Sequence, residues 1–414
     1  MKGKKMKSNI MVVDSIMGSG KTSFFLKYMK ERPSEKFLVI TPYLDEVKRI
    51  KDEVGLIEPR PIKGSKLNHI RELTGLGKSI VSTHALLGRF DLEIQENIKI
   101  SEYTLILDEV ANVVEQFTFN TQSDKEDFFT HYAYVDEKGY CIWDEEKHPV
   151  NEYSKGSKFY EEMCLCLNKN LIQVNDKLLM WELPIEIFKK FKEVIILTYL
   201  FEGSVQKPYF DSFDIEYKLQ SVKNGELIPY EETSVEDKQK IISLINMIST
   251  PSLDMIGLNE YDLSSTWYRK NLVKPIYVER LKNNLSNFFK NIAKATTKQT
   301  MWSTFKEYKN KLKGKGYTKS FCQYNIRATN DYRHCSALAY LLNVFPHTSL
   351  TMYFNEKGLK EINKDKYALS ILLQWIWRSR IRNIADSDEN RKIDLYLPSS
   401  RMKHILMDWL SPEA

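Results

Sequence analysis

Short apolar runs recur along the first half of the chain, and stretches with apolar residues at helical spacing lie between them. Runs of this kind, bounded by polar or turn residues, are typical of buried strands. Strands and helices in alternation predict an α/β fold with a mostly parallel, doubly wound sheet that binds ligands at the carboxyl ends of its strands. The predicted strands are 10–13, 36–42, 79–84, 103–109 and 193–199, and helices are predicted at 24–29, at 44–50 and from 85.

The second half of the chain carries a similar but less regular pattern. Strands are predicted at 299–305, 347–354 and 392–398, and one long helix at 367–381. From 117 to 190 hairpin-like segments and acidic loops break the alternation, which indicates an insertion. The predicted division is a first lobe at 1–215 with an insertion at 118–190, a linker and mixed helical region at 216–290, and a second lobe at 291–414.

A glycine-containing stretch, Asp14 to Ser23, lies between the first predicted strand and the first predicted helix. Glycines let backbone N–H groups turn inward around an anion, and the helix start adds free donors and a positive dipole end. In such a loop Lys21 reaches the β- and γ-phosphates of a nucleotide, and the Thr22 hydroxyl binds Mg²⁺. The strict pattern has glycine in place of Ser15, and a chance glycine turn is the alternative. The predicted cofactor-binding residues are Gly18, Ser19, Gly20, Lys21, Thr22 and Ser23.

Two acids, Asp108 and Glu109, end the predicted strand 103–109. Beside a phosphate loop, Asp108 would hold Mg²⁺, usually through water, because this ion keeps much of its hydration shell. Glu109 would orient or deprotonate the attacking water as a general base. The alternative is a strand end with two solvated acids. With the phosphate loop, the pair predicts a hydrolytic site with Lys21, Asp108 and Glu109 as catalytic residues.

Composition changes this picture little. The 414 residues are 42% hydrophobic and 28% charged, which predicts globular cores. The net charge of +6 is compatible with nucleic-acid binding without requiring it. The five cysteines form no C-x-x-C pair, so we expect a reducing compartment and no zinc site. Without a signal sequence or an apolar run of membrane-spanning length, a soluble, cytoplasmic protein with no membrane contact is expected.

The order of these elements resembles that of a superfamily 2 helicase of the DEAD/DEAH type, of the compact kind found in bacteriophages. The stretch from Ser15 to Thr22 resembles the first motif of that family, and Asp108-Glu109-Val110-Ala111 stands where the family has Asp-Glu-x-x. Leu197-Thr198-Tyr199 resembles the element that couples hydrolysis to movement. The resemblance implies two RecA-like lobes with ATP and Mg²⁺ between them, and the host cytoplasm as the location if the protein is phage-encoded.

The same resemblance implies contacts with a nucleic-acid backbone. In the first lobe the matching segments are 39–42 with Arg49, and 82–84. In the second lobe the match is 326–331, where Asn330 falls at the place of the family's acid. The implied nucleic-acid contacts are Thr41, Pro42, Arg49, Thr83, His84, Arg327, Thr329 and Asn330.

The stretch from Gln374 to Arg382 resembles the arginine-finger motif of the family. Gln374 and Arg378 match in register, whereas the last arginine of the family falls on Ile381. Arg380 or Arg382 must therefore take its place. The resemblance thus implies catalytic roles for Gln374 and for an arginine among Arg378, Arg380 and Arg382, which supply charge stabilisation to the γ-phosphate.

The arginines can also be considered without the resemblance. Arg378 and Arg382 are four residues apart and share a face of the predicted helix, with Arg380 roughly opposite. Trp375 and Trp377 lie on the same helix. In a two-lobed motor one such face would look across the cleft at the γ-phosphate. The alternative is a basic surface helix whose tryptophans belong to the core.

Two further basic stretches remain open. Trp267-Tyr268-Arg269-Lys270 could stack on a single strand, although a plain surface patch is the simpler interpretation. The alternating lysines from Lys309 to Lys315 form a turn that is either solvated surface or a phosphate contact.

The function predicted from these motifs is an ATP-dependent helicase or translocase. The expected partner is DNA, single-stranded or forked, in preference to RNA, with a replication protein as a further partner and a role in phage DNA replication or recombination implied by the resemblance. The alternative is a nucleic-acid-binding ATPase switch that unwinds nothing, and a packaging-type ATPase is a third possibility.

Overall fold

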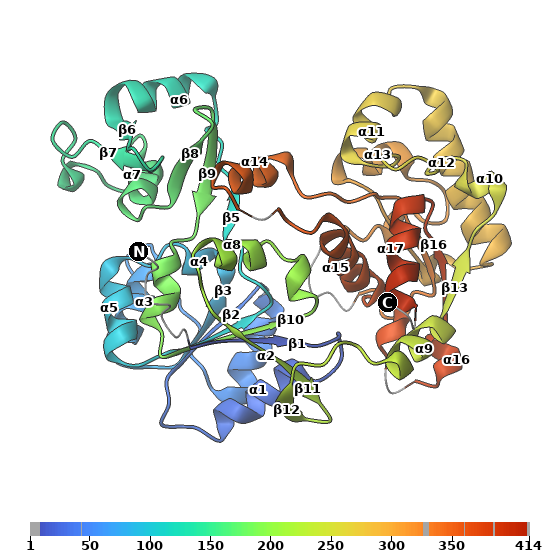
Figure 1. The fold of residues 1–414 in the computed structure, drawn as a ribbon, viewed down its shortest axis with the longest axis horizontal. Coiled ribbons are helices and arrows are strands. Elements are labelled where there is room, and N and C mark those ends of the chain that lie inside the picture. Colours follow the sequence, from blue (N-terminus) through green and yellow to red (C-terminus); the bar gives the residue numbers. More distant parts are fainter. Residues whose placement is uncertain (1–8, 43, 326–330, 360, 384–385, 412–414) are drawn as a thin grey trace. The chain divides into compact units, whose positions relative to one another are not determined.

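The computed structural model describes residues 9–42, 44–325, 331–359, 361–383 and 386–411 (Figure 1). The chain divides into two compact units. The first contains the residues up to Asp14, Gly20–Tyr230 and His347–Ile362. The second contains Ser15–Ser19, Glu231–Pro346 and the residues from Asn363 onward. Within the described part of the chain, no helix is long and apolar enough to cross a membrane.

In the described residues the first unit is built on a seven-stranded sheet in the order β12-β11-β1-β10-β4-β2-β3. All neighbouring strands are parallel except β11 and β12, which pair as an antiparallel hairpin. The central strands are almost wholly buried, as the continuous apolar runs predict. The strands are β1 Ile10–Asp14, β2 Phe37–Thr41, β3 Ile80–Thr83, β4 Thr104–Asp108, β10 Glu193–Thr198, β11 Lys218–Lys223 and β12 Glu226–Pro229.

Amphipathic helices flank this sheet. Phe25 and Leu26 of the first helix pack with Val13 and Val39 in one core cluster. Polar side chains accept hydrogen bonds from the free backbone N–H groups at the helix starts. For example, the Asp91 carboxylate accepts from Ile94 N at 3.0 Å. The helices are α1 Lys21–Lys30, α2 Leu44–Val54, α3 Lys66–Gly75, α4 His84–Leu87, α5 Leu92–Ile100 and α8 Gln206–Ser212.

The segment between β4 and β10 has a small core of its own, which includes Phe128, Trp143 and Phe159. The hairpin-like character predicted within 117–190 is confirmed at one place, because β6 (Ala133–Val135) pairs antiparallel with β7 (Cys141–Trp143). A three-stranded antiparallel sheet in the order β5-β9-β8 lies in the same described segment. Its elements are β5 Val114–Gln116, β8 Leu171–Val174, β9 Leu178–Glu182, α6 Gln122–Asp127 and α7 Tyr160–Leu167.

The strand predicted at 347–354 is wrong. These residues form α14 (Thr348–Glu356), with Ser349, Leu350, Tyr353 and Phe354 buried. These four residues are spaced so that they lie on one face of a helix. The prediction had assigned the apolar run the two-residue period of a strand instead. The helix starts after His347, whose ring nitrogen Nδ1 accepts from Ser349 N at 3.3 Å.

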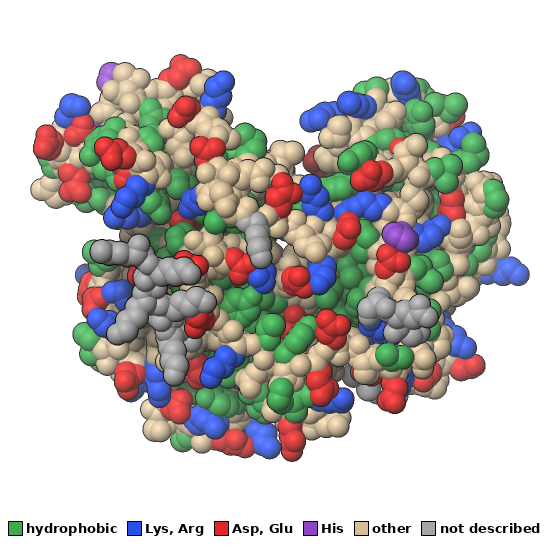
Figure 2. Space-filling model, in the orientation of Figure 1, with side chains coloured by type: hydrophobic (Ala, Val, Ile, Leu, Met, Phe, Trp, Pro, Cys, Tyr) green, Lys and Arg blue, Asp and Glu red, His purple; other side chains and the backbone are tan. Residues whose placement is uncertain are grey.

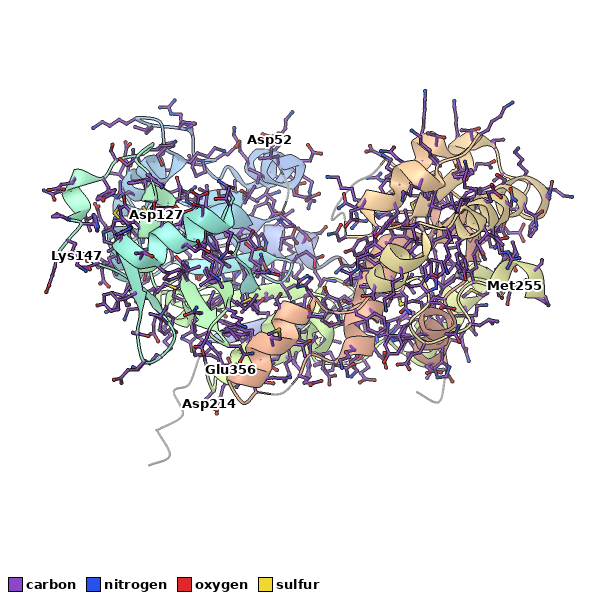
Figure 3. The ribbon with its side chains drawn as sticks, turned by 90° about the horizontal axis from the view of Figure 1, so that it is seen from above. Asp52, Asp127, Lys147, Asp214, Met255 and Glu356 are labelled. Atoms are coloured by element: carbon purple, nitrogen blue, oxygen red, sulfur yellow. The ribbon has the colours of Figure 1, made fainter. Side chains whose placement is uncertain are left out.

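Helix α14 packs against the β5-β9-β8 sheet through a buried acid, Glu182. The carboxylate of Glu182 accepts from the Tyr353 hydroxyl, from Lys357 Nζ at 2.6 Å and from the Tyr140 hydroxyl at 3.3 Å. Burial and the Glu182 charge raise the pKa of both tyrosines. Lys357 Nζ also lies 5.3 Å from the centroid of the Phe213 ring. The residues next to these two in the sequence, Glu356 and Asp214, are labelled in Figure 3.

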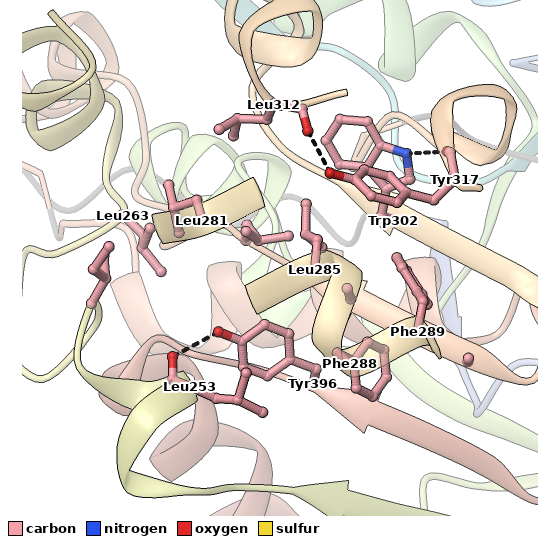
Figure 4. Close-up of a cluster of buried hydrophobic side chains, with 14 of the residues drawn as sticks. Leu253, Leu263, Leu281, Leu285, Phe288, Phe289, Trp302, Leu312, Tyr317 and Tyr396 are labelled. Carbon is pink, nitrogen blue, oxygen red and sulfur yellow. Dashed lines mark hydrogen bonds between the residues drawn. The ribbon is translucent and has the colours of Figure 1, made fainter. Parts of the chain in front are cut away.

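The second unit contains, in its described residues, a four-stranded parallel sheet in the order β13-β16-β15-β14. Its core (Figure 4) is rich in aromatic residues whose polar atoms are satisfied internally. The indole of Trp302 donates to Tyr317 O at 2.8 Å, and the hydroxyl of Tyr396 donates to Leu253 O at 2.8 Å. The elements are β13 Ile245–Ile248, β14 Thr300–Ser303, β15 Ala337–Tyr340, β16 Ile393–Tyr396, α9 Val235–Leu244, α10 Pro251–Asp254, α11 Ser265–Asn271, α12 Pro275–Asn287, α13 Lys309–Leu312, α15 Lys364–Ile376, α16 Asp388–Arg391 and α17 Ser400–Leu410.

The predicted fold class is confirmed, since both units are α/β with mostly parallel sheets flanked by helices. The region 216–290, predicted as a linker and mixed helical region, contains the helices α9 to α12 together with strands. Its first part supplies β11 and β12 to the first sheet, and β13 belongs to the second. The long helix predicted at 367–381 is also wrong, because α15 ends at Ile376 and a separate 3₁₀ turn forms at Arg380–Arg382.

The Glu182 contacts predict a large effect of one substitution on stability. Glu182→Ala leaves Lys357 and two tyrosine hydroxyls without their acceptor in a buried place, and should lower the free energy of unfolding by about 2–4 kcal/mol. Urea unfolding followed by tryptophan fluorescence measures this. Glu186→Ala is the control, because it removes an exposed pair with Lys189 and should cost only about 0–1 kcal/mol. Equal losses in the two variants would contradict a structural role for Glu182.

Candidate functional site

The loop between β1 and α1 carries two glycines in the left-handed region, Gly18 at φ 85° and Gly20 at φ 88°. Side chains rarely adopt this conformation, so the turn favours glycine at both places. A Cβ built on Gly20 would meet no atom within 4 Å, which leaves open space in front of the backbone. Gly20 caps α1, and the helix then starts with Lys21, Thr22 and the exposed Ser23. The loop therefore has the form of an anion cradle at a helix start.

Lys21 lies among three carboxylates of the first unit. Burial lowers the pKa of the Lys21 ammonium, while the charges of Glu109, Asp14 and Asp108 act in the opposite direction. One ammonium facing three acids leaves the site with an excess of negative charge. A divalent cation would offset that excess.

Thr22 and Asp108 are joined by a hydrogen bond. The hydroxyl of Thr22 donates to Asp108 Oδ1 at 3.0 Å, although 86 residues separate the two in the sequence. Burial, and next the charge of Glu109, raises the pKa of Asp108 to about 6, with the Thr22 hydrogen bond opposing the shift. Hydroxyl and carboxylate oxygens are the donors that Mg²⁺ prefers. The two predicted metal-binding residues are thus brought together.

Glu109 follows β4 in an uncommon backbone conformation, with φ at 99°. Such a conformation in a residue with a side chain costs on the order of 1–3 kcal/mol and persists only where the surroundings hold it. Here Glu109 N donates to Leu197 O at 2.9 Å, and Ala111 N donates to the buried side chain of Gln206 at 2.9 Å. These bonds turn the chain after Asp108 so that Glu109 stays beside Lys21 and Asp108.

Asp14 was missed as a functional residue by the sequence analysis. Its two carboxylate oxygens accept from Leu200 N and Phe201 N, both at 2.8 Å. Burial raises the pKa of Asp14. Its backbone oxygen accepts from the Ser221 hydroxyl at 2.9 Å. Asp14 thus ties the start of the glycine loop to the segment after β10, and the signal in the sequence was an acid that ends a buried apolar run.

The first-unit residues expected to touch nucleic acid lie at the carboxyl ends of β2 and β3 or on α2. The side chain of Thr41 is fully buried, and Pro42 follows it. Thr83 precedes α4, whose first residue is His84. Arg49 is paired within α2, with Glu46 at 2.7 Å and Glu53 at 3.6 Å.

In the second unit, the residues expected to supply the arginine finger do not share a helix face. Gln374 lies near the end of α15, and the buried Arg378 follows it. Arg380 Nε donates to Lys392 O at 2.6 Å, while the side chain of Arg382 is exposed. Trp375 and Trp377 are buried. This agrees with the alternative interpretation of the segment, in which the tryptophans belong to the core. Three further expected nucleic-acid contacts lie outside the described residues: Arg327, Thr329 and Asn330.

Comparison with known proteins places the chain in a family. The chain is 40% identical over 416 aligned positions to the SPbeta prophage-derived protein YonV of Bacillus subtilis (strain 168), covering 97% of this chain and 98% of that protein. The chain belongs to the YonV family. Residues 239–410 also match the family model of the YonV C-terminal Rossmann-like domain, a range that includes all four strands of the second sheet.

Among solved structures, two XPD proteins cover much of this chain. The apo structure of XPD has a TM-score of 0.48 at 12% identity, covering 97% of this chain and 95% of its own. Xpd4 of S. tokodaii has a TM-score of 0.46 at 11% identity, with 97% and 94% covered. Both TM-scores lie below 0.5, so neither likeness decides the fold or the function of a member of the YonV family.

The residues of the loop fit a nucleotide bound with Mg²⁺. In the described part of the chain no three side chains of His, Cys, Asp or Glu converge as a self-contained metal site requires. Thr22 and Asp108, which are joined by a hydrogen bond, would hold Mg²⁺ together with water and phosphate oxygens, which is the usual arrangement for this ion. The open space at Gly20 leaves room for the phosphates.

The raised pKa of Asp108 predicts a stability change with a definite sign. Because the folded protein holds this proton more tightly than the unfolded chain, ionised Asp108 destabilises the fold as pH rises from 3.8 through about 6. Without Mg²⁺ at pH 7.5, Asp108→Asn should therefore be more stable than wild type by on the order of 1 kcal/mol. Below about pH 4 the difference should vanish. Thermal unfolding over a pH series measures it, and a difference that does not change with pH would contradict the assigned charge.

Proposed function

We propose that the chain hydrolyses Mg-ATP and couples hydrolysis to movement along a nucleic acid, as a helicase or translocase. The observation that carries the proposal is the Thr22–Asp108 hydrogen bond, formed beside Lys21 and Glu109 at the carboxyl edge of a parallel sheet. A hydroxyl and a carboxylate for Mg²⁺, an ammonium for phosphate and a carboxylate for water are the parts that phosphoryl transfer requires.

Each residue of the site has a distinct task in this proposal. The backbone from Gly18 to Gly20 and the ammonium of Lys21 bind the phosphates. Thr22 and Asp108 hold Mg²⁺, which, when bound, neutralises charge on the phosphate oxygens. Glu109 accepts the proton of the attacking water.

Asp14 is a positioning residue in this scheme. It fixes the backbone at Leu200 and Phe201 relative to the start of the loop. That segment directly follows the stretch 197–199, which resembles the coupling element of helicases. A change in the loop on hydrolysis would therefore be passed to the segment after β10.

Among the arginines of the second unit we assign the finger to Arg382. Arg378 is buried, and Arg380 is bound to the backbone at Lys392. The side chain of Arg382 is the most exposed of the three. Gln374 would assist from the end of α15.

The relative of the chain supports the biological setting. YonV of Bacillus subtilis is a prophage-derived protein by its name. We therefore place the activity in the cytoplasm of a phage host, on single-stranded or forked DNA in replication or recombination, with a replication protein as a possible partner.

A second candidate is an ATP-driven binding switch that unwinds nothing. It is favoured by the internal engagement of Arg378 and Arg380, because a motor needs an arginine that reaches the nucleotide in each cycle. In a switch, hydrolysis alters only the affinity for nucleic acid.

Steady-state ATP hydrolysis tests the proposed chemistry. Glu109→Gln should lower kcat by roughly 10²–10⁴ while ATP binding is retained, because only proton acceptance is lost. Lys21→Ala should lose both ATP hydrolysis and ATP binding. The control is Glu115→Gln, a change at an exposed glutamate six residues further on that should leave kcat unchanged. Full activity of Glu109→Gln would overturn the role given to Glu109.

The effect of nucleic acid on ATP hydrolysis, measured together with strand displacement, distinguishes a motor from a switch. At low salt, single-stranded or forked DNA should stimulate ATP hydrolysis by the wild type, and the protein should displace a strand from a fork. Arg382→Ala should abolish stimulated hydrolysis and displacement together. Stimulation without displacement would favour the switch, and no stimulation by DNA or RNA would contradict both.

A further inference from the structure

Two basic stretches that lie far apart in the sequence meet in the second unit. The ring of Tyr268 on α11 stacks on Tyr308, with centroids 5.0 Å apart, and packs edge to face with Phe305 at 5.6 Å. Lys311 Nζ on α13 donates to Leu272 O at the end of α11, at 3.3 Å. These contacts join the segments 265–282 and 305–325 into one surface, which we call the basic face.

The basic face concentrates the positive charge of the chain. Segment 305–325 contains six lysines and one glutamate, and segment 265–282 contains five basic residues and one glutamate. Together they carry a net charge of +9, more than the +6 of the whole chain, so the remainder is net acidic. Figure 2 shows Lys and Arg side chains gathered at the edge of the second unit where α11 and α13 lie.

Among the residues that the structure describes, the lysines of segment 305–325 form no ion pair with an acid. Lys313, Lys315 and Lys319 are exposed. An uncompensated lysine cluster is the usual footprint of a polyanion-binding surface.

A surface pocket opens in the same segment, where the chain leaves the carboxyl end of β14, and Lys306 is part of its lining. Its volume is about 500 Å³, within the range of roughly 300–1,000 Å³ found for small-ligand sites. Two aromatic residues line it, with ring centroids 5.7 Å apart, and two residues with amide side chains belong to the lining as well. The lining residues are Phe305, Lys306, Glu307, Gln323, Tyr324 and Asn325.

We propose that the basic face binds a single-stranded nucleic acid, with its phosphates along the lysines and one unpaired base in this pocket. A base can stack on Tyr324 or Phe305, and the amides of Gln323 and Asn325 can hydrogen-bond to its edge. A duplex keeps its bases stacked and paired, so it offers phosphates but no base to the pocket. The inference rests on the proposed function for its substrate class, and it adds where and in which form that substrate binds.

The test of the phosphate contacts is binding of a labelled single-stranded oligonucleotide by the full chain without ATP, measured by fluorescence anisotropy over a salt series. Lys313→Ala/Lys315→Ala should weaken binding several-fold and make the slope of log affinity against log salt shallower by about 1.4. The control, Lys30→Ala/Lys138→Ala, removes two exposed lysines of the first unit and should change neither. Equal effects of the two double variants would overturn the phosphate contacts.

The base pocket is tested from the ligand side, which needs no folded variant. An oligonucleotide of abasic sites should bind the wild type about five-fold or more weakly than a normal strand. Tyr324→Leu should bind both strands equally. If the wild type does not distinguish the two strands, or binds duplex as tightly as single strand, the base pocket is wrong. Tighter binding to anionic lipid vesicles than to any oligonucleotide would assign the face to a membrane surface and overturn the proposal.

The outcome is separable from the proposed catalytic function. Lys21→Ala should keep full oligonucleotide binding, because the basic face contains none of the nucleotide site. If oligonucleotide binding follows these expectations and no ATP hydrolysis is found, the proposed motor activity is wrong, and the proposed binding by the basic face is supported. If DNA stimulates ATP hydrolysis and the double variant Lys313→Ala/Lys315→Ala binds the oligonucleotide normally, the proposed binding by the basic face is wrong, and the proposed motor activity is supported.

Discussion

The hydrogen bond from the Thr22 hydroxyl to Asp108 Oδ1 is the contact on which the candidate site depends. It joins the first turn of α1 to the end of β4, and with Lys21 it defines where a metal ion and phosphates would meet. Asp14, Asp108 and Glu109 outnumber the single ammonium of Lys21. Free ATP, itself an anion, would be repelled by this excess, whereas Mg²⁺ bound together with ATP would place positive charge between the phosphates and Asp108. Burial is the main cause of the raised pKa values of Asp14 and Asp108, and the charge of Glu109 adds to both shifts.

Parallel pairing brings these residues together from distant parts of the chain. Strand β10 lies between β1 and β4, with Asp14 opposite Thr198 and Asp108 opposite Leu197. The three strand ends therefore meet at one edge, where their loops are held by the Asp14 and Glu109 backbone contacts. A sheet of this kind is rigid in its buried strands and adjustable in its loops, so the loops at this edge are the part of the unit that could adapt to a ligand.

Continuous apolar runs made five of the seven described strands of the first sheet predictable, whereas β11 and β12 were not predicted. The glycine loop and the acid pair pointed to Lys21, Thr22, Asp108 and Glu109 as candidate residues from local chemistry alone. Local signals were weaker elsewhere. Strand β15, Ala337–Tyr340, is a four-residue apolar segment without turn residues to mark it, and it was not predicted. Helix α14 was assigned the period of a strand because both periods fit so short a run. Arg378 and Arg382 were expected to share one helix face, yet α15 ends at Ile376 and the chain turns before Arg380. Asp14 could not be assigned a role from the sequence, because its partners at Leu200 and Phe201 lie 186 and 187 residues away.

The central claim is that the glycine loop, with Thr22 and Asp108, binds Mg-ATP. The most direct measurement is the thermal unfolding midpoint of the full chain with Mg-ATP, with ATP and a chelator, and without nucleotide. Binding to the folded state alone must raise the midpoint. We predict a clear rise with Mg-ATP in the wild type, a much smaller one with ATP and chelator, and none with either in Lys21→Ala. An unchanged midpoint in the wild type, or the same rise in Lys21→Ala, would contradict the account.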